Sequence, residues 1–217
     1  MLHLHRNEPQ AASTDTRWVD TAAVQATVLF VDLRGYTGLA ERLPPPRILP
    51  LLNELFGILV AATDMHRGRI FHLAGDGLMA GFGIDDRASA GASEALAAGN
   101  DMLRQFAPVA IRWRRELSIE AGIGVGIHCG EVAIGFIGPA GRQAATVVGD
   151  TVNVAARLCG RARAGELLFS AAVASALDGA HALPSTDCYL RLPKFALRGR
   201  SAPLDIWCVP AVERLAI

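Results

Sequence analysis

Two aspartates stand in sequence settings that suit a cation-binding carboxylate. Asp32 ends an apolar, β-branched run that begins at Ala26 and is typical of a buried strand. Asp76 lies between Gly75 and Gly77, in a stretch that is typical of a tight hairpin. Carboxylates at strand ends that meet at one edge of a sheet can hold hard divalent cations for phosphate chemistry. Taken singly, each aspartate is more typical of a turn or a helix cap, so it is the pair that favours a cation site.

Two further segments offer hydrogen-bond donors to an anion. Gly35, Tyr36 and Thr37 form a glycine-containing bend whose backbone N–H groups can face an anion before a helix begins. Asn153 and Arg157 are four residues apart and therefore share one face of a predicted helix. A neutral amide and a forked cation that point the same way suit the charge of phosphoryl oxygens. The alternative is a surface asparagine beside an arginine in a salt bridge.

A basic segment near the C-terminus is a weaker candidate. Arg198 and Arg200 flank Gly199 between the two closing strands, a pattern typical of a turn. Either arginine could reach a polyphosphate, and a solvated basic turn is the equal alternative.

Composition limits the classes of partner. The chain has 217 residues, of which 51% are apolar, so it fits one domain with extensions and a full core. Lys and Arg together number 21, as do Asp and Glu, so no net charge points to nucleic acid or an anionic membrane. The four cysteines lack the spacing of a zinc site or a disulfide framework, which makes a reducing cytosol the expected location. No run approaches the ~18 apolar residues that span a bilayer.

The order of apolar patterns predicts an α+β fold. Strand, helix, strand, strand, helix, strand is the ferredoxin-like βαββαβ order, with an antiparallel sheet and both helices on one face. The opposite face must then be covered by something else. Pro50 is expected in the first turn of the first helix, and 113–115 in an exposed connection. The last core strand is rich in glycine, which indicates close approach of another backbone. The predicted segments are 26–31, 47–66, 69–73, 78–82, 88–106 and 119–130.

Further elements are expected after this core. A hairpin at 131–138 and 144–148 leads to a helix that Asp150 or Thr151 can cap. The remainder comprises segments at 166–170 and 171–177, without an assigned structure, and two closing strands at 189–192 and 204–209. The domain is expected to span 21–212, with a tail or linker at 1–20 that lacks the apolar core of a signal peptide and a short tail at 213–217. A regulatory domain absent from this chain could precede it.

From about residue 26 to 209 the sequence resembles the catalytic domain of class III nucleotidyl cyclases, the family of adenylate and guanylate cyclases. Four separated motifs occur in the order of that family: LFVDLRGYTGLAERL, FHLAGDGLMAGFG, GVGIHCGEVAIGFIG and VVGDTVNVAARL. The resemblance implies a class III cyclase fold. It also implies a homodimer in which two chains arranged head to tail share each active site.

The resemblance also implies a role for several residues. Asp32 and Asp76 match the aspartates that bind two Mg²⁺ or Mn²⁺ ions, with the backbone carbonyl of Leu33 as a further ligand. Asn153 and Arg157 match the pair that orients the ribose and stabilises the transition state. Arg198 stands where the family commonly has a lysine that contacts the terminal phosphates, and arginine keeps the charge but changes the geometry.

The residues expected to contact the base depart from the usual pattern. His72 stands where adenylate cyclases usually have lysine, and Thr146 where many have aspartate, although bacterial adenylate cyclases also have threonine there. Ala144 and Ala145 replace the acidic and aromatic residues often found just before it. The Glu and Cys pair typical of guanylate-specific members is absent from these two positions. A hydroxyl can accept from the adenine amino group and an imidazole can donate to ring N1, so adenine is favoured, although both side chains could also donate to guanine O6.

These features predict an adenylate cyclase that converts ATP into 3′,5′-cyclic AMP and pyrophosphate. The alternatives are a guanylate cyclase and a nucleotide-binding regulatory module that has lost turnover. His72 also fits a histidine satisfied on a sheet surface, without contact to a base.

Overall fold

The computed structural model describes residues 23–84, 90–139, 141–178, 189–197 and 202–210. The described strands are β1 (Val24–Arg34), β2 (Arg69–Ala74), β3 (Gly77–Phe82), β4 (Gly122–Ile137), β5 (Ala144–Val148), β6 (Leu167–Ser170), β7 (Leu190–Phe195) and β8 (Leu204–Val209). The described helices are α1 (Tyr36–Arg42), α2 (Pro45–Met65), α3 (Ala92–Leu117), α4 (Asp150–Arg161) and α5 (Ala171–Asp178).

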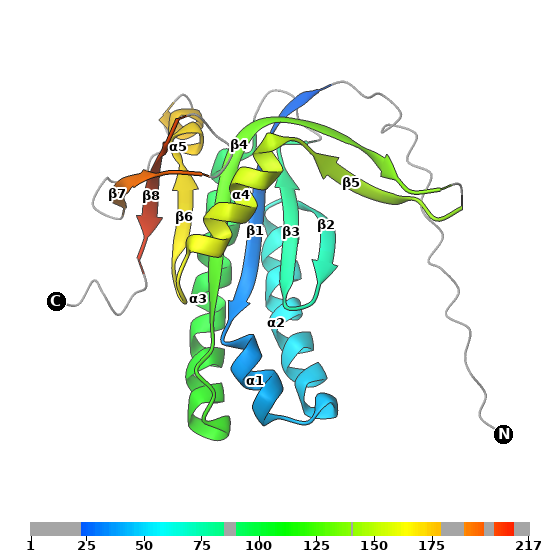
Figure 1. The fold of residues 1–217 in the computed structure, drawn as a ribbon, viewed down its shortest axis with the longest axis vertical. Helices are drawn as coiled ribbons and strands as arrows, with labels where there is room; N and C mark the ends of the chain where they lie inside the picture. The colour runs from blue at the N-terminus through cyan, green and yellow to red at the C-terminus, as the bar shows by residue number, and fades with distance from the viewer. Residues whose placement is uncertain (1–22, 85–89, 140, 179–188, 198–201, 211–217) are drawn as a thin grey trace.

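The strands form one mixed sheet in the order β2-β3-β1-β4-β6-β8-β7, and β5 pairs with β4 off this path. The four strands β2, β3, β1 and β4 are antiparallel neighbours, and they are joined through α2 and α3. This is the predicted ferredoxin-like order, so the sequence prediction of the core is confirmed. In Figure 1, α4 lies across one face of the sheet, while α2 and α3 pass behind it.

Alternating side chains of β1 contribute to a separate core on each face of the sheet. Leu29 and Val31 pack in the core shared with α2 and α3, where Leu55 and Phe106 are also buried. Ala26 and Val28 pack on the opposite face in a second cluster. This second face is the one that the sequence prediction left without a covering element. It is covered by α4 and β5, which contribute Ala155 and Val147 to the buried cluster.

Glycines of β4 allow α4 to lie directly on the strand. A Cβ added at Gly126 would stand 2.0 Å from the backbone nitrogen of Cys159 and 2.5 Å from the carbonyl oxygen of Ala155. Real Cβ atoms essentially never approach so closely. The predicted close approach of another backbone is therefore confirmed, and that backbone is α4.

Helix α3 is longer than predicted and corrects the expectation for 113–115. The prediction ended this helix at 106, before Pro108, but the helix continues through the proline to Leu117. Trp113 is 1% exposed, and its indole N–H donates to Glu54 Oε2 at 3.2 Å. Burial of a large aromatic side chain with a satisfied N–H outweighs the loss of one helical hydrogen bond at the proline.

Two smaller expectations about helix starts are also wrong. Pro50 lies inside α2 rather than in its first turn, because the helix begins at Pro45. The N-cap of α4 is Gly149, with no side-chain cap, so neither Asp150 nor Thr151 caps that helix. The Thr151 hydroxyl instead donates to the carbonyl oxygen of Glu131 at 2.8 Å, which ties the start of α4 to β4.

The predicted strands 119–130 and 131–138 form one continuous strand, β4. Its second half pairs with β5, and Figure 1 shows the two strands extending from the body as an arm. We call residues 133–148 the β4–β5 arm. Phe136, Ile137 and Val148 of this arm are exposed apolar side chains. The arm therefore presents apolar surface away from the core of its own chain.

Helix α2 is long and apolar enough to cross a membrane by length and composition, with a mean hydropathy of 1.5 over its best window. The sequence has no uninterrupted apolar run of this length, because Asn53 and Glu54 lie within the helix. One helix of this kind is weak support for a membrane span, since core helices pass the same test. Leu55, Leu59 and Ala62 are fully buried in the core that α2 shares with the sheet.

Candidate active site

The structure brings Asp32 and Asp76 together at one end of β1 and β3. Asp32 is paired with Gly77, and the backbone N–H of Leu33 donates to the carbonyl oxygen of Asp76 at 3.2 Å. A Cβ at Gly77 would stand 2.9 Å from the Val31 carbonyl oxygen and 3.2 Å from Asp32 Oδ1. Glycine at this position therefore lets the turn of Asp76 approach the Asp32 carboxylate.

The environment of Asp76 disfavours its charged form. Burial raises the pKa of Asp76, and the negative charge of Asp32 raises it further. Two partly desolvated carboxylates that repel each other are what a divalent cation would neutralise. Carboxylate and backbone carbonyl oxygens are the ligands that Mg²⁺ and similar hard cations prefer. The donor types of Asp32 and Asp76 therefore fit such an ion, and the Leu33 carbonyl stays a predicted ligand.

This site has few protein ligands. Within the described residues, no group of three or more His, Cys, Asp or Glu side chains could hold a metal ion. Mg²⁺ is commonly bound by one or two carboxylates together with waters and substrate phosphates. A site of two aspartates thus matches a cation that arrives with, or is completed by, a phosphate ligand.

Arg34 is a member of this site that the sequence analysis missed. Its Nη1 donates to Asp32 Oδ2, and its Nε donates to the carbonyl oxygen of Ala162 at 3.0 Å. Its Nη2 donates to the carbonyl oxygen of Cys159. The signal was present in the sequence: Asp32 and Arg34 are two residues apart on a strand, so their side chains share a face.

Asn153 and Arg157 lie on the exposed face of α4, as the four-residue spacing predicted. Cys159 lies on the buried face of α4, and burial raises the pKa of its thiol to about 11. The negative charges of Asp32 and Asp76 also raise this pKa, so Cys159 lies near both carboxylates. Arg157 is two residues from Cys159, which is about 200° around a helix of 3.6 residues per turn. Arg157 therefore lies on the opposite side of α4 from Cys159.

The glycine bend after Asp32 leads into a short helix, as predicted. Gly35 has φ 90° and is the N-cap of α1, which begins at Tyr36. A Cβ at Gly35 would stand 2.1 Å from the Glu120 carbonyl oxygen, so only glycine fits here. Thr37 is exposed and Tyr36 is half-buried against the core. The first-turn N–H groups of α1 lack helical partners, which suits an anion near Asp32.

The two predicted base-contacting residues lie on β2 and β5, which contact each other without being paired in the sheet. His72 is exposed on β2, Thr146 is half-buried on β5, and these strands are close to one another. An irregularity in the pairing of β2 with β3 falls between Ile70 and His72, and it places His72 opposite Met79. Bulges of this kind re-aim side chains. His72 thus shares the face of Met79, which packs in the cluster beneath β5.

The remaining predicted residues precede Thr146 or lie near the C-terminus. Ala144 and Ala145 lie at the start of β5, exposed and half-buried respectively. Arg198 and Arg200 lie outside the described residues.

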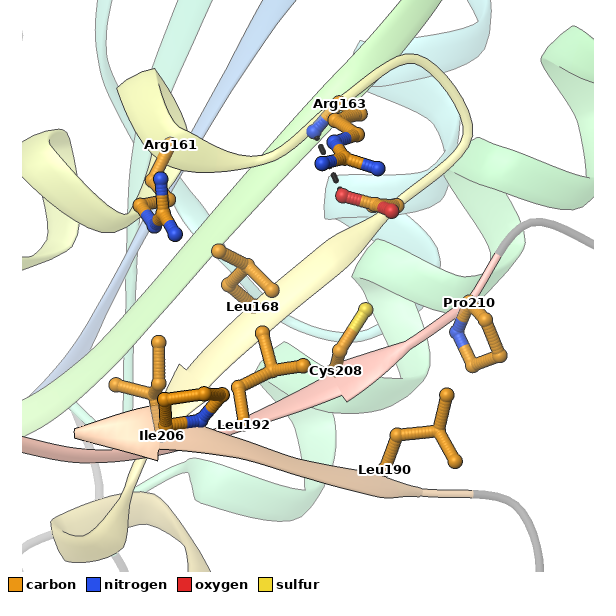
Figure 2. Close-up of a pocket in the computed structure, with 10 residues that line it drawn as sticks. Arg161, Arg163, Leu168, Leu190, Leu192, Ile206, Cys208 and Pro210 are labelled. Atoms are coloured by element: carbon orange, nitrogen blue, oxygen red, sulfur yellow. Dashed lines mark hydrogen bonds between the residues drawn. The ribbon is translucent and has the colours of Figure 1, made fainter. Parts of the chain in front are cut away.

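A separate cavity of about 170 Å³ lies where the end of α4 meets β6, β7 and β8. Figure 2 shows its apolar floor, with Leu168, Leu192 and Ile206, and the two arginines Arg161 and Arg163 at its edge. The backbone N–H of Arg163 donates to the Glu166 carboxylate at 2.9 Å, which satisfies part of the polar lining. None of the predicted site residues that the structure describes lines this cavity.

Comparisons with known proteins agree with the geometry. Residues 20–203 match the family model described as the adenylate and guanylate cyclase catalytic domain. The uncharacterized protein Rv1319c of Mycobacterium tuberculosis is 33% identical over 185 residues, which cover 85% of this chain and 32% of that protein. The chain therefore spans about a third of the length of the curated relatives that it matches.

Two solved structures are similar over most of their length. The adenylyl cyclase CyaB from P. aeruginosa is 28% identical with a TM-score of 0.77, covering 87% of this chain and 94% of that chain. The guanylyl cyclase Cya2 is also 28% identical, with a TM-score of 0.75, covering 88% of this chain and 94% of that chain. Overall identity therefore does not distinguish a preference for ATP from one for GTP.

Proposed function

The chain belongs to the family of adenylate and guanylate cyclase catalytic domains, and from this premise we propose that it converts ATP into 3′,5′-cyclic AMP and pyrophosphate. The observation that supports catalysis most directly is the pair of carboxylates, Asp32 and Asp76, held together at the edge of the sheet. Asn153 and Arg157 on the exposed face of α4 supply the second half of the machinery.

In the proposed reaction, the ribose 3′-oxygen forms a bond to the α-phosphorus in line with the leaving group. The bond from the α-phosphorus to the β-phosphate oxygen breaks, pyrophosphate leaves with the electron pair, and the hydroxyl proton passes to solvent. Asp32, Asp76 and the Leu33 carbonyl would hold Mg²⁺ or Mn²⁺, two ions per site. Bound divalent ions lower the pKa of the attacking hydroxyl and neutralise phosphate charge.

The protein residues position the nucleotide. Asn153 would orient the ribose, and Arg157 would hydrogen-bond the oxygens of the α-phosphate as their charge grows. The backbone N–H groups of Gly35, Tyr36 and Thr37 lie just after Asp32 and would contact phosphate oxygens. Loss of one such preorganised donor typically costs ~10²- to 10³-fold in rate.

Asn153 and Arg157 lie on the exposed side of α4 rather than on its packed side, which supports a site shared between two chains. Arg157 lies on the side of α4 opposite the face that packs on the sheet near Asp32. A second copy, arranged head to tail, could present its α4 to these carboxylates, and twofold symmetry would then make two equivalent sites. The exposed apolar side chains of the β4–β5 arm give such a dimer a surface to bury.

Complementation tests the shared site. Asp32→Ala and Arg157→Ala chains should each be inactive alone, because every site in either homodimer lacks one half. Mixed dimers contain one site with both halves intact and should recover up to half of the activity per dimer. No recovery from a mixture that forms heterodimers would reject the shared site.

Adenine is the proposed base because His72 and Thr146 lie on β2 and β5, which contact each other, and offer a donor and an acceptor. Competition between ATP and GTP in one assay with Mn²⁺ measures the preference directly. His72→Lys should raise the preference for ATP over GTP. If the kinetics with both nucleotides are unchanged in this variant, His72 does not contact the base and its role is structural. Preferred turnover of GTP would make the protein a guanylate cyclase, a candidate supported by the equal identity to Cya2.

A nucleotide-binding regulatory module is the second candidate, and the altered base-contacting residues His72 and Ala145 favour it. The same assay separates the two functions, because a module would bind nucleotide and release no cyclic product. The relatives are about three times longer than this chain, so a sensor or regulatory domain elsewhere in the protein is also part of this proposal. A cytoplasmic location is proposed from the cysteine usage alone.

A further inference from the structure

Arg34 joins the proposed cation site to the end of α4. Each of the three guanidinium nitrogens has a partner: Asp32 Oδ2, the carbonyl of Ala162 and the carbonyl of Cys159. The Arg34 side chain is 23% exposed, whereas that of Asp32 is 44% exposed. The contact is thus a fixed bridge beneath α4 rather than a solvated surface ion pair.

The sheet is shaped to admit this guanidinium. A Cβ at Gly124 would stand 2.7 Å from Arg34 Nη2 and 2.9 Å from the Ala162 carbonyl oxygen. The last carbonyls of a helix lack helical donors, and a cation near them is favoured by the helix dipole. Arg34 therefore has a stable place at the C-terminal end of α4 that does not depend on Asp32.

The two oxygens of Asp32 face different partners. Oδ2 accepts from Arg34, while Oδ1 faces Gly77 and the turn of Asp76, 3.2 Å from where a Cβ of Gly77 would stand. Two cations shared by Asp32 and Asp76 would need both oxygens of Asp32. The oxygen Oδ2 cannot bind Arg34 and the second cation at full strength together.

Resting on the two-carboxylate cation site of the proposed function, we propose that Arg34 is a positioning residue that acts as a built-in counter-ion of Asp32. Without cations it neutralises Asp32 and fixes the carboxylate orientation. A cation that binds Oδ2 displaces Arg34 from Asp32, and the guanidinium stays on the carbonyls of Cys159 and Ala162. Arg34 thereby lowers the cation affinity and links cation loading to the helix that bears Asn153 and Arg157.

Mn²⁺ binding without nucleotide tests the inference independently of turnover. Free Mn²⁺ is measured by electron paramagnetic resonance during titration of the full chain and of Arg34→Gln, which keeps a donor but removes the charge. Arg34→Gln should bind Mn²⁺ about tenfold more tightly, equivalent to about 1.4 kcal/mol. Arg161→Gln is the matched control, because Arg161 lies at the same end of α4 and contacts Phe195 rather than Asp32. Its Mn²⁺ affinity should equal that of the unmodified chain.

The outcomes separate this inference from the proposed function. Equal affinity in Arg34→Gln and the unmodified chain, or weaker affinity in Arg34→Gln, would overturn the counter-ion role. If Asp32→Asn binds Mn²⁺ as well as the unmodified chain, the proposed cation site itself is wrong. Should Arg34→Gln fail to fold in a thermal melt, Arg34→Lys replaces it. Lysine keeps the positive charge but lacks the planar, forked donors of arginine. The Mn²⁺ affinity of Arg34→Lys should therefore lie between that of the unmodified chain and a value tenfold higher. An Mn²⁺ affinity of Arg34→Lys at or below that of the unmodified chain would overturn the inference.

Discussion

Replacement of Gly126 by alanine tests how α4 is seated on the sheet. The added Cβ would stand 2.0 Å from the Cys159 nitrogen, 2.5 Å from the Ala155 carbonyl oxygen and 2.6 Å from the Cys159 Cα. These are backbone atoms of one helix, so no side-chain rotation can relieve the overlap. The helix must move away from β4 as a unit.

The expected displacement follows from these distances. Ordinary van der Waals contact begins at 3.4 Å, which leaves the Cβ short of the Cys159 nitrogen by about 1.4 Å. Overpacking of this kind lowers the free energy of unfolding by ~1–3 kcal/mol. Because the neighbouring atoms belong to a helix backbone, we expect a loss of ~3 kcal/mol for Gly126→Ala. For a chain of this size that corresponds to a fall in melting temperature of roughly 6–12 °C. A shift of ~1 Å in α4 misplaces Arg157 and should lower the cyclase rate by ~10²-fold.

Circular dichroism melts and a cyclic-nucleotide assay measure both effects. Gly135→Ala is the matched control, because Gly135 lies on the same strand and a Cβ there meets nothing within 4 Å. The control should melt within ~2 °C of the unmodified chain, since surface substitutions usually change stability by less than ~0.5 kcal/mol. If Gly126→Ala melts like the control and turns over like the unmodified chain, the backbone contact between α4 and β4 is not as described.

Two charge substitutions give opposite pH dependences. The pKa of Asp76 is raised from 3.8 by burial and by the charge of Asp32, so the folded protein binds this proton more tightly than the unfolded chain. The free energy of unfolding then falls as pH rises from 3.8 through the folded pKa. In EDTA, Asp76→Asn should therefore have a higher melting temperature than the unmodified chain at pH 7, and this gain should vanish below pH 3.8. A lower melting temperature of Asp76→Asn at pH 7 would contradict this reasoning. The pKa of Glu54 is lowered from 4.5, chiefly by its hydrogen bond from Arg112. Glu54→Gln should therefore melt lower at pH 7, and the difference should narrow as pH falls below 4.5 through the folded pKa, whereas a constant difference would exclude the ionic contribution.

The parts of the site that depend on local pattern could be predicted from the sequence. A buried strand that ends in Asp32 and a glycine-flanked Asp76 define the same sheet edge whenever the hairpin pairs with that strand. The spacing of Asn153 and Arg157 fixes their common helical face without any tertiary information. Glycines at alternate positions of 122–126 indicated a close backbone, although not which one.

The parts that depend on contacts distant in sequence could not be predicted in the same way. The burial of Trp113 depends on Glu54, 59 residues earlier, which accepts its indole proton. The partners of Arg34 on α4 are more than 120 residues away. The N-cap of α4 was misassigned because Thr151, a good local cap, donates to β4 instead.

The opposite faces of α4 determine how this domain can be controlled. One face is fixed to the sheet by glycine contacts with β4 and by Arg34 at its end, so the helix has little freedom to turn within its own chain. Asn153 and Arg157 lie on the other, exposed face, and in the proposed dimer they serve a site that a second chain completes. In the proposed dimer, a small change in how two chains meet therefore alters catalysis while each fold stays unchanged. A regulatory domain elsewhere in the protein would then need to change only the dimer interface. The exposed β4–β5 arm is an element through which such a domain could act.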